Sequence, residues 1–237
     1  MSTGEANEED DLADLPAAYR AWRASTLGRI TDALEEDRVL DLIGPPEGQR
    51  ILDAGCGDGK LAVELVRRGG SVSGVDASPA MIAAARVRAR REGVGAGFGV
   101  AEVEGLPFEA GSFDTVVAVT VLCFADDPRA SLREMARVLR PGGRLVVGEL
   151  GRWSAWAAKR RVRGWLGSRV WRQARFRTAA ELQTLACEAG LVETEVLGAI
   201  YYPPLGLAAR MLAPIDRKLA AVTTVGAAFL VLSAEKP

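Results

Sequence analysis

The sequence predicts a doubly wound α/β fold, in which helices cover both faces of a mostly parallel sheet. At 237 residues the chain is long enough for one such domain. Between residues 49 and 150, short β-branched runs alternate with amphipathic segments of helical period. This alternation favours parallel strands joined by crossover helices. We see no internal repeat or second core, so we expect a single domain over residues 1–237.

The expected strands are short and apolar, and turn residues bound them. In chain order they read RILDAG, SVSGVD, AGFGVAE, SFDTVVAVT, RLVVGEL, LVETEVLGAIYY and VTTVGAAFLVLSA. The helices read KLAVELVRRG, SPAMIAAARVRARREG, DPRASLREMARVLRPGG, TAAELQTLACEAG and PLGLAARMLAPIDRKLA. Ser78 and Pro79 suit the cap and the first position of a helix. The Pro-Gly-Gly run at residues 141–143 predicts the end of the next helix.

Composition divides the chain into five segments. We expect an acidic disordered tail, N-terminal cap helices, a cofactor-binding core, a basic tryptophan-rich lid and the C-terminal part of the sheet. The cap segment predicts one long helix ending near Gly44, preceded by a turn or short helix at Tyr19 and Trp22. The five segments cover residues 1–15, 16–48, 49–150, 151–177 and 178–237.

The charge balance and the missing residue types exclude several classes of function. The 30 Lys and Arg residues offset 31 Asp and Glu residues, so no global basic field favours nucleic acid. The sequence contains no histidine, which excludes a Ser-His-Asp triad and a His-ligated metal within this chain. Its three cysteines form no CxxC pair, which favours a reducing compartment. We therefore expect a cytoplasmic protein without a metal site.

Three glycines alternate with other residues directly after the first expected strand. Gly55, Gly57 and Gly59 allow left-handed backbone and the close approach of a ligand to amides at a helix start. The dinucleotide fingerprint GxGxxG would need a glycine at the position that Lys60 occupies. The spacing therefore disfavours NAD and an oxidoreductase.

Two acidic residues follow the next two strands. Asp76 ends SVSGVD, where a carboxylate accepts hydrogen bonds from two ribose hydroxyls, and Glu102 follows the strand after it. Parallel strand ends converge at one edge of such a sheet. The expected ligand is a nucleoside that carries something other than a pyrophosphate.

Four stretches carry a family resemblance: ILDAGCGDG, VSGVDAS, AEVEGLPFEAGSFDTVVAVTVLCF and LREMARVLRPGGRLVV. In this order they resemble class I S-adenosylmethionine-dependent methyltransferases, particularly the small-molecule, type 11-like group. The resemblance spans residues 50–150. It implies a Rossmann-like, seven-stranded sheet with an antiparallel last strand, and S-adenosyl-L-methionine as the cofactor.

The resemblance also implies roles for individual residues. Asp53 would lie near the ammonium group of the cofactor, Asp76 would hold its ribose, and Met81 would lie against its adenine. Glu102 stands where the family usually has Asp. Cys56 reads as a small packed residue in a tight turn rather than a nucleophile. The expected cofactor-binding residues are Asp53, Gly55, Cys56, Gly57, Gly59, Asp76, Ala77, Met81, Glu102, Val103, Thr120, Leu122, Trp22 and Arg29.

Methyl transfer from a sulfonium is an in-line displacement, so the protein chiefly aligns the reactants and excludes water. We expect a small-molecule acceptor, anionic or resembling a lipid or quinone, whose reacting atom the sequence leaves open. A hydroxyl acceptor would benefit from a base, for which Tyr19, Glu149 and Tyr201 are candidates. The residues expected to contact the acceptor are Cys123, Phe124, Arg175 and Tyr202.

The segment GRWSAWAAKRRVRGWLGSRVWRQARFR has nine basic residues, four tryptophans and no acid. It suits a lid whose tryptophans pack on the core, a site where Arg163, Arg175 or Arg177 holds an anionic substrate, or contact with a membrane surface or RNA. An RNA methyltransferase is disfavoured because no NPPY-type tetrad follows the fourth strand. A module that binds the cofactor or its demethylated product without catalysis is the alternative to an enzyme.

Overall fold

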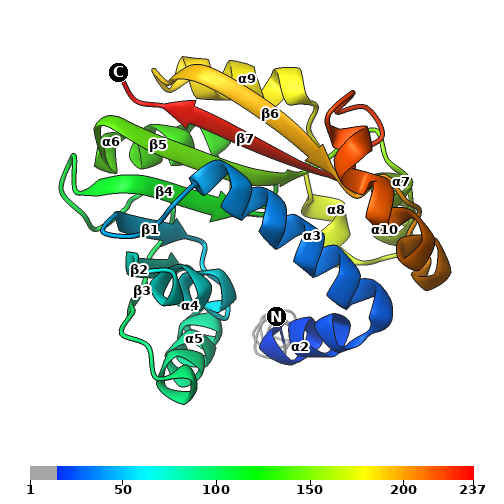
Figure 1. Cartoon of the computed structure of the whole chain (residues 1–237), viewed down its shortest axis with the longest axis horizontal. Helices are drawn as coiled ribbons and strands as arrows, with labels where there is room; N and C mark the ends of the chain where they lie inside the picture. The colour runs from blue at the N-terminus through cyan, green and yellow to red at the C-terminus, as the bar shows by residue number, and fades with distance from the viewer. Residues whose placement is uncertain (1–14) are drawn as a thin grey trace, which may run out of the picture.

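The protein's structure, a computed structural model, describes residues 15–237, so the expected acidic tail lies outside the described residues except for Leu15. The strands are β1 Arg50–Ala54, β2 Ser71–Asp76, β3 Gly97–Val100, β4 Phe113–Val119, β5 Leu139–Leu150, β6 Val192–Ala199 and β7 Phe229–Glu235. They form one seven-stranded sheet in the order β3-β2-β1-β4-β5-β7-β6 (Figure 1). Strands β1 to β5 pair in parallel, and β7 runs antiparallel to β5 and β6. The predicted fold is confirmed, including its antiparallel last strand.

Helices cover both faces of this sheet (Figure 1). Their bounds are α2 Leu15–Ala24, α3 Thr26–Ile43, α4 Lys60–Arg67, α5 Pro79–Glu92, α6 Pro128–Val138, α7 Ala155–Trp165, α8 Arg169–Gln173, α9 Ala179–Glu188 and α10 Gly206–Ala220. Alternate residues of a strand point to opposite faces, so Leu145 and Val147 pack in one apolar cluster and Val146 in another. The first cluster includes residues of α6 and α9, and the second includes residues of α3 and α4.

Local signals placed several element ends correctly. Ser78 caps α5 and accepts a hydrogen bond from the Met81 backbone. Helix α3 ends at Gly44, whose left-handed φ of 74° suits glycine. The short turn between α2 and α3 depends on Gly28, because a Cβ there would lie 1.9 Å from the Trp22 carbonyl oxygen.

Two expected boundaries were wrong. The Pro-Gly-Gly run does not end α6, which stops earlier, at Val138, because Leu139 is already extended and pairs with Phe113 of β4. Residues 141–143 belong to β5 instead. The last strand begins at Phe229, and residues 221–228 before it are turn and loop.

The parallel strands place their carboxyl ends at one edge of the sheet, where ligands bind in folds of this type. The glycine loop after β1, Asp76 at the end of β2 and the loop after β4 all lie there. Helix α3 crosses one face of the sheet, and its first turns lie toward this edge together with α2 and α8 (Figure 1). Within the described part of the chain, no helix combines the length and hydropathy needed to cross a membrane.

Candidate active site

The loop between β1 and α4 needs glycine at three positions. Gly55, Gly57 and Gly59 have φ values of 79°, 52° and 73°, which glycine adopts at little cost. A Cβ at Gly55 would lie 2.2 Å from Val121 Cγ2, and one at Gly59 would lie 2.9 Å from Ala85 Cβ. A Cβ at Gly57 would meet no atom within 4 Å. Packing therefore requires two of the glycines, whereas Gly57 faces open space that a ligand can enter.

Asp53, at the carboxyl end of β1, carries a buried oxygen without a partner. The residue is 2% exposed, and its Oδ2 accepts no hydrogen bond from the described residues. Burial, with a smaller contribution from Asp76, raises the pKa of this carboxyl to about 7. An unsatisfied buried oxygen is costly unless a ligand completes it. This position fits the ammonium group of an amino-acid ligand.

Asp76, at the end of β2, holds the glycine loop in place. Its Oδ2 accepts a hydrogen bond from the Gly57 backbone and its Oδ1 accepts one from Ser78, both at 2.9 Å. A carboxylate can accept about four hydrogen bonds, so each oxygen retains a free lone pair. Met81 is buried one turn into α5, and Ala77 is exposed. Asp76 thus serves the loop and is still able to accept bonds from ribose hydroxyls.

The residues after β3 and β4 differ in what they expose. Glu102 is exposed in the loop after β3, and Val103 beside it is buried. Thr120 has a left-handed φ of 55°, which marks a sharp turn directly after β4. The sequence predicts that Leu122 contacts the cofactor. In the structure its side chain is fully buried, and its carbonyl oxygen accepts a hydrogen bond from Arg177 at 3.0 Å.

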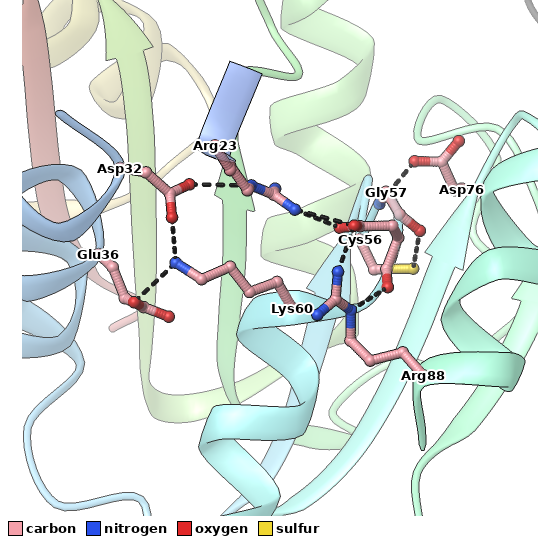
Figure 2. Close-up of polar contacts among 9 residues, drawn as sticks. Arg23, Asp32, Glu36, Cys56, Gly57, Lys60, Asp76 and Arg88 are labelled. Atoms are coloured by element: carbon pink, nitrogen blue, oxygen red, sulfur yellow. Dashed lines mark hydrogen bonds and ion pairs between the residues drawn. The ribbon is translucent and has the colours of Figure 1, made fainter. Parts of the chain in front are cut away.

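A charge network that the sequence did not predict joins the N-terminal helices to the glycine loop (Figure 2). Arg23 of α2 donates to both carboxylate oxygens of Asp58, at 2.9 and 2.8 Å, and to Asp32 of α3 at 3.1 Å. Lys60 pairs with Asp32 and, at 2.8 Å, with Glu36. Lys60 therefore has a role beyond interrupting a dinucleotide motif, since it ties α4 to α3.

Asp58 lies at the centre of this network. Arg88 of α5 also pairs with its carboxylate and donates to its backbone carbonyl at 2.9 Å. Burial alone would raise the pKa of Asp58, but Arg23 and Arg88 outweigh it and hold the pKa below its ordinary value. Two arginines from different helices thus fix the loop that Gly57 opens. The sequence signal was the acid inside the glycine run, but its partners lie far away in the chain.

Two of the expected bases are committed to structural contacts. Glu149 is fully buried, where it pairs with Arg177 at 3.3 Å and accepts from the Cys123 backbone at 3.2 Å. Burial raises the pKa of Glu149 to about 7, although Arg177 opposes the shift. Tyr201 donates its hydroxyl proton to the Thr223 carbonyl, and burial raises its pKa to about 12. These contacts give both residues a structural role, and a role for either as a base stays a prediction.

Two expected acceptor contacts are also corrected. Tyr202 is 2% exposed, and its hydroxyl pairs with Thr31 Oγ1 at 3.1 Å. Cys123 is 0% exposed and packs with Leu150 and Phe176. Both side chains are enclosed by elements distant in the chain, since Tyr202 packs with residues of α3 and Cys123 with Leu150 and Phe176. Burial also raises the pKa of the Cys56 thiol, which agrees with the expected packing role.

The remaining predicted residues are at least partly accessible. Phe124 is 41% exposed, and Arg175 is exposed while donating to the Asp126 carbonyl at 3.2 Å. Trp22 is half-buried, whereas the Arg29 side chain is exposed and makes no hydrogen bond or ion pair with the described residues. Of these N-terminal candidates, neither reaches the glycine loop through a polar contact. Their neighbour Arg23 does.

A second group of residues gathers beside this network and contains two that the sequence reasoning missed. Arg160 of α7 lies over the rings of Trp156 and Trp171, with its guanidinium carbon 5.2 and 4.8 Å from their centroids. Glu35 of α3 and Tyr19 of α2 are close enough for their charges to affect one another and Arg160. Arg23 lies over the Tyr19 ring at 5.4 Å, which links this group to Asp58 of the glycine loop. We call Tyr19, Glu35, Arg160, Trp156 and Trp171 the Arg160 cluster.

Comparison with known proteins gives a consistent result. A family model described as a methyltransferase domain matches residues 52–147. A ubiquinone biosynthesis O-methyltransferase of Xanthomonas axonopodis pv. citri is 35% identical over 206 residues, covering 83% of this chain and 85% of that protein.

Solved structures extend the similarity to the whole fold. A Thermotoga maritima S-adenosylmethionine-dependent methyltransferase, described as a possible histamine N-methyltransferase, has a TM-score of 0.73 and 26% identity, covering 95% of this chain and 97% of that one. Phosphoethanolamine N-methyltransferase 2 of Haemonchus contortus, solved with S-adenosyl-L-methionine, has a TM-score of 0.67 and 21% identity over 97% of this chain and 60% of that one. The latter similarity shows the fold alone.

Proposed function

The chain belongs to the class I S-adenosylmethionine-dependent methyltransferases, and from this membership we propose that it methylates a small, quinone-like molecule. It is an enzyme whose cofactor is S-adenosyl-L-methionine. Two observations carry our assignment of the site: Asp53 Oδ2 is buried without a partner among the described residues, and Gly57 in the loop that follows faces open space.

The residues present fit this cofactor. We assign its ammonium group to Asp53, its ribose to Asp76 and its methionine portion to the backbone of residues 55–57. When bound, S-adenosyl-L-methionine supplies a methyl group on a positively charged sulfur. The chain holds the glycine loop rigid through Asp58, so that the acceptor and the methyl group can be aligned. We assign residues 49–150 to cofactor binding and residues 151–177 to a lid over the acceptor.

The quinone-like acceptor is supported by the relative from Xanthomonas, which is named as a ubiquinone biosynthesis O-methyltransferase. Its similarity covers 83% of this chain and so extends beyond residues 52–147, which match the general family model. The residues that choose the acceptor lie largely in that extension. The same relative makes an apolar acceptor with a reactive oxygen the first class of compound to test.

Two measurements test the proposal. Calorimetric titration should show binding of S-adenosyl-L-methionine and S-adenosylhomocysteine and no binding of NAD. Transfer of a labelled methyl group should then be detected with quinols of increasing side-chain length. Cofactor binding without transfer to any quinol, amine or thiol would favour a binding module, and transfer only to RNA would replace the small-molecule acceptor.

Replacing Asp76 tests the placement of the cofactor. We expect Asp76→Ala to weaken cofactor binding by about 1.5 to 3 kcal/mol, the range for hydrogen bonds to a charged group. Part of this loss reflects the contacts of Asp76 with Gly57 and Ser78. The cofactor-free variant should therefore also be measured by thermal denaturation, to separate a loosened loop from a lost ribose contact. Unchanged affinity would refute the placement.

We also propose that the protein contacts an anionic membrane surface peripherally. Trp165 and Leu166 at the end of α7 are each 82% exposed, and Leu207 and Met211 of α10 are 72% and 69% exposed. Trp156 of α7 and Ala209 of α10 belong to the same apolar cluster, and the two helices lie on the same side of the molecule (Figure 1). Large exposed apolar side chains with basic residues between them suit a lipid interface, which is where a long-chain quinone resides.

A further inference from the structure

We propose that Arg160 and Glu35 bind the reacting group of the acceptor and select an ionisable hydroxyl over an amine. This inference rests on the proposed function and identifies the residues that determine its acceptor. The first supporting observation is the position of the two helices that carry Arg160 and Glu35. Trp156, beside Arg160 on α7, donates from Nε1 to the Tyr202 carbonyl at 2.9 Å, and Tyr202 pairs with Thr31 of α3. The helix of Arg160 is therefore tied to the helix of Glu35.

Arg160 has a guanidinium group that two aromatic rings keep in place, and its N–H groups donate to none of the described residues. Its guanidinium lies over the rings of Trp156 and Trp171, and Trp156 is only 7% exposed. Among the described residues, no carboxylate or carbonyl lies within hydrogen-bond distance of it, although its side chain is half-buried. An arginine offers five donors in a planar fork, and leaving them unpaired in a buried position is costly. Two aromatic rings orient this group, and none of the described residues supplies a hydrogen-bond partner for it.

Glu35 differs from the acids beside it on α3. Asp32 and Glu36 pair with Lys60, whereas Glu35 has no ion pair or hydrogen bond with a described residue. Burial of its carboxyl raises the pKa of Glu35 to about 7. Arg160 and, more weakly, Lys60 and Arg23 oppose this shift, and Asp32 adds to it. Near neutral pH this carboxyl is therefore able both to accept and to release a proton.

The combination of groups favours one chemistry at the acceptor. A cationic amine would meet the fixed positive charge of Arg160, while Glu35 is partly neutral and offsets it poorly. A hydroxyl fits, because its proton passes to the Glu35 carboxylate as its oxygen becomes negative beside Arg160. An oxygen lone pair then forms the O–C bond to the methyl group, and the electrons of the broken C–S bond stay on sulfur. Tyr19 of α2 interacts electrostatically with both Glu35 and Arg160, so it can help to position the acceptor hydroxyl.

A chromogenic phenol tests Arg160 without catalysis. The absorption spectrum of 4-nitrophenol changes when its hydroxyl ionises, so binding to the complex with S-adenosylhomocysteine should shift the spectrum toward the anion. We expect Arg160→Ala to weaken this binding at least tenfold and to abolish the shift. Arg160→Lys should retain part of it, because the charge remains and the planar fork is lost. Lys159→Ala, an exposed cation on the same helix, is the matched control and should match the parent.

The pH profile of methyl transfer tests Glu35. The groups that act on its carboxyl are Arg160 of α7, Asp32 of α3, Lys60 of α4 and Arg23 of α2. We expect the rate with a quinol to rise with pH through about 7 in the parent and in Asp37→Asn, whose side chain is exposed. In Glu35→Gln the rate should fall at least tenfold, and this rise should disappear.

The outcomes separate the two proposals. If the parent methylates quinols, but Arg160→Ala keeps both the acceptor KM and the spectral shift, the inference fails and the proposed function stands. Absence of any spectral shift with the parent likewise overturns the inference. If the protein binds the cofactor and methylates only amines, the proposed acceptor and the inference fail together. Unaltered cofactor affinity in Arg160→Ala and Glu35→Gln is required in every case, and its loss would assign both residues to the cofactor instead.

Discussion

Asp53 shows how a single residue can favour cofactor binding while it lowers the stability of the cofactor-free protein. Its carboxyl is enclosed by the sheet edge, and one oxygen has no partner in the described structure. The sequence alone placed an acid at this strand end, which is consistent with a simple structural cap. The backbone of Ala62 in α4 does donate to this carboxyl as it would to a cap, but a cap alone does not account for Oδ2, which has no partner among the described residues. The ligand-binding interpretation gains most of its support here.

The pKa of Asp53 makes this trade-off measurable. Burial raises it from the ordinary 3.8 to about 7, so the folded state disfavours the ionised form. The unfolded chain releases this proton near pH 3.8, so the resulting loss of stability is absent below that pH and complete above about 7. This shift corresponds to a destabilisation of about 4 kcal/mol at pH 8. An amide at this position still incurs part of the cost of burying a polar group, so Asp53→Asn should raise the free energy of unfolding of the cofactor-free protein by about 2 kcal/mol.

Denaturant unfolding at pH 4 and pH 8 checks this expectation, with and without S-adenosylhomocysteine. The gain should be present at pH 8 and nearly absent at pH 4. The added ligand should stabilise the parent but have little effect on Asp53→Asn, because an amide cannot neutralise an ammonium group. A variant less stable than the parent at pH 8 would show that the Asp53 carboxylate already has a stabilising partner.

At the scale of elements, the N-terminal helices are joined to the cofactor loop by charge pairs rather than by the expected aromatic residue. Arg23 of α2 contacts Asp58 in the loop, and Lys60 of α4 contacts two acids of α3. The same Arg23 lies over the Tyr19 ring. Arg23 therefore links α2 to the glycine loop through Asp58 and to the Arg160 cluster through Tyr19.

This coupling predicts the effect of removing Arg23. We expect Arg23→Ala to weaken cofactor binding about tenfold, equivalent to about 1.4 kcal/mol, because the loop loses one of the two arginines on Asp58. Arg20→Ala, which removes an exposed cation from the same helix, should retain the affinity of the parent. Calorimetric titration of both variants with S-adenosylhomocysteine is the measurement. Equal affinities would show that α2 does not stabilise the loop.

Glu149 also joins separate elements through a charge pair, in the C-terminal half of the chain. Its pair with Arg177 joins the end of β5 to the segment after α8, and its second oxygen accepts from the loop after β4. A buried ion pair of this kind contributes mainly by leaving no charge unpaired. The residue that looked like a base at a strand end also supports the loop where the acceptor is expected.

At the scale of the whole molecule, the exposed apolar residues are concentrated on a few late elements. Residues of α7, α8 and α10 and of the loop after α10 account for most of the large exposed hydrophobic side chains among the described residues. Two of these elements contribute to the Arg160 cluster, since Arg160 belongs to α7 and Trp171 to α8. A surface that contacts lipid would therefore lie next to the proposed acceptor site.

Vesicle flotation tests this arrangement. The parent should float with vesicles that contain phosphatidylglycerol and should be released as the salt concentration rises, because its basic residues supply part of the attraction. A double variant, Trp165→Ser with Met211→Ser, should stay behind while it methylates a short-chain, water-soluble quinol at the rate of the parent. Equal flotation of parent and variant would contradict membrane contact through these helices.

The sequence by itself determined the sheet, most element boundaries and the part of the site that lies within short local motifs. Glycines, the acids Asp53 and Asp76, and the alternation of strands and helices act over a few residues, so their consequences can be read from the printed chain. Pairings between distant residues cannot, because the choice between a base and a buried ion pair depends on which elements fold against it. Only the tertiary structure placed Arg23 on Asp58, enclosed Glu149 and Tyr202, and brought Glu35 to Arg160. Burial and the partner's charge set the chemistry of such a side chain, and both arise only when the helices have packed.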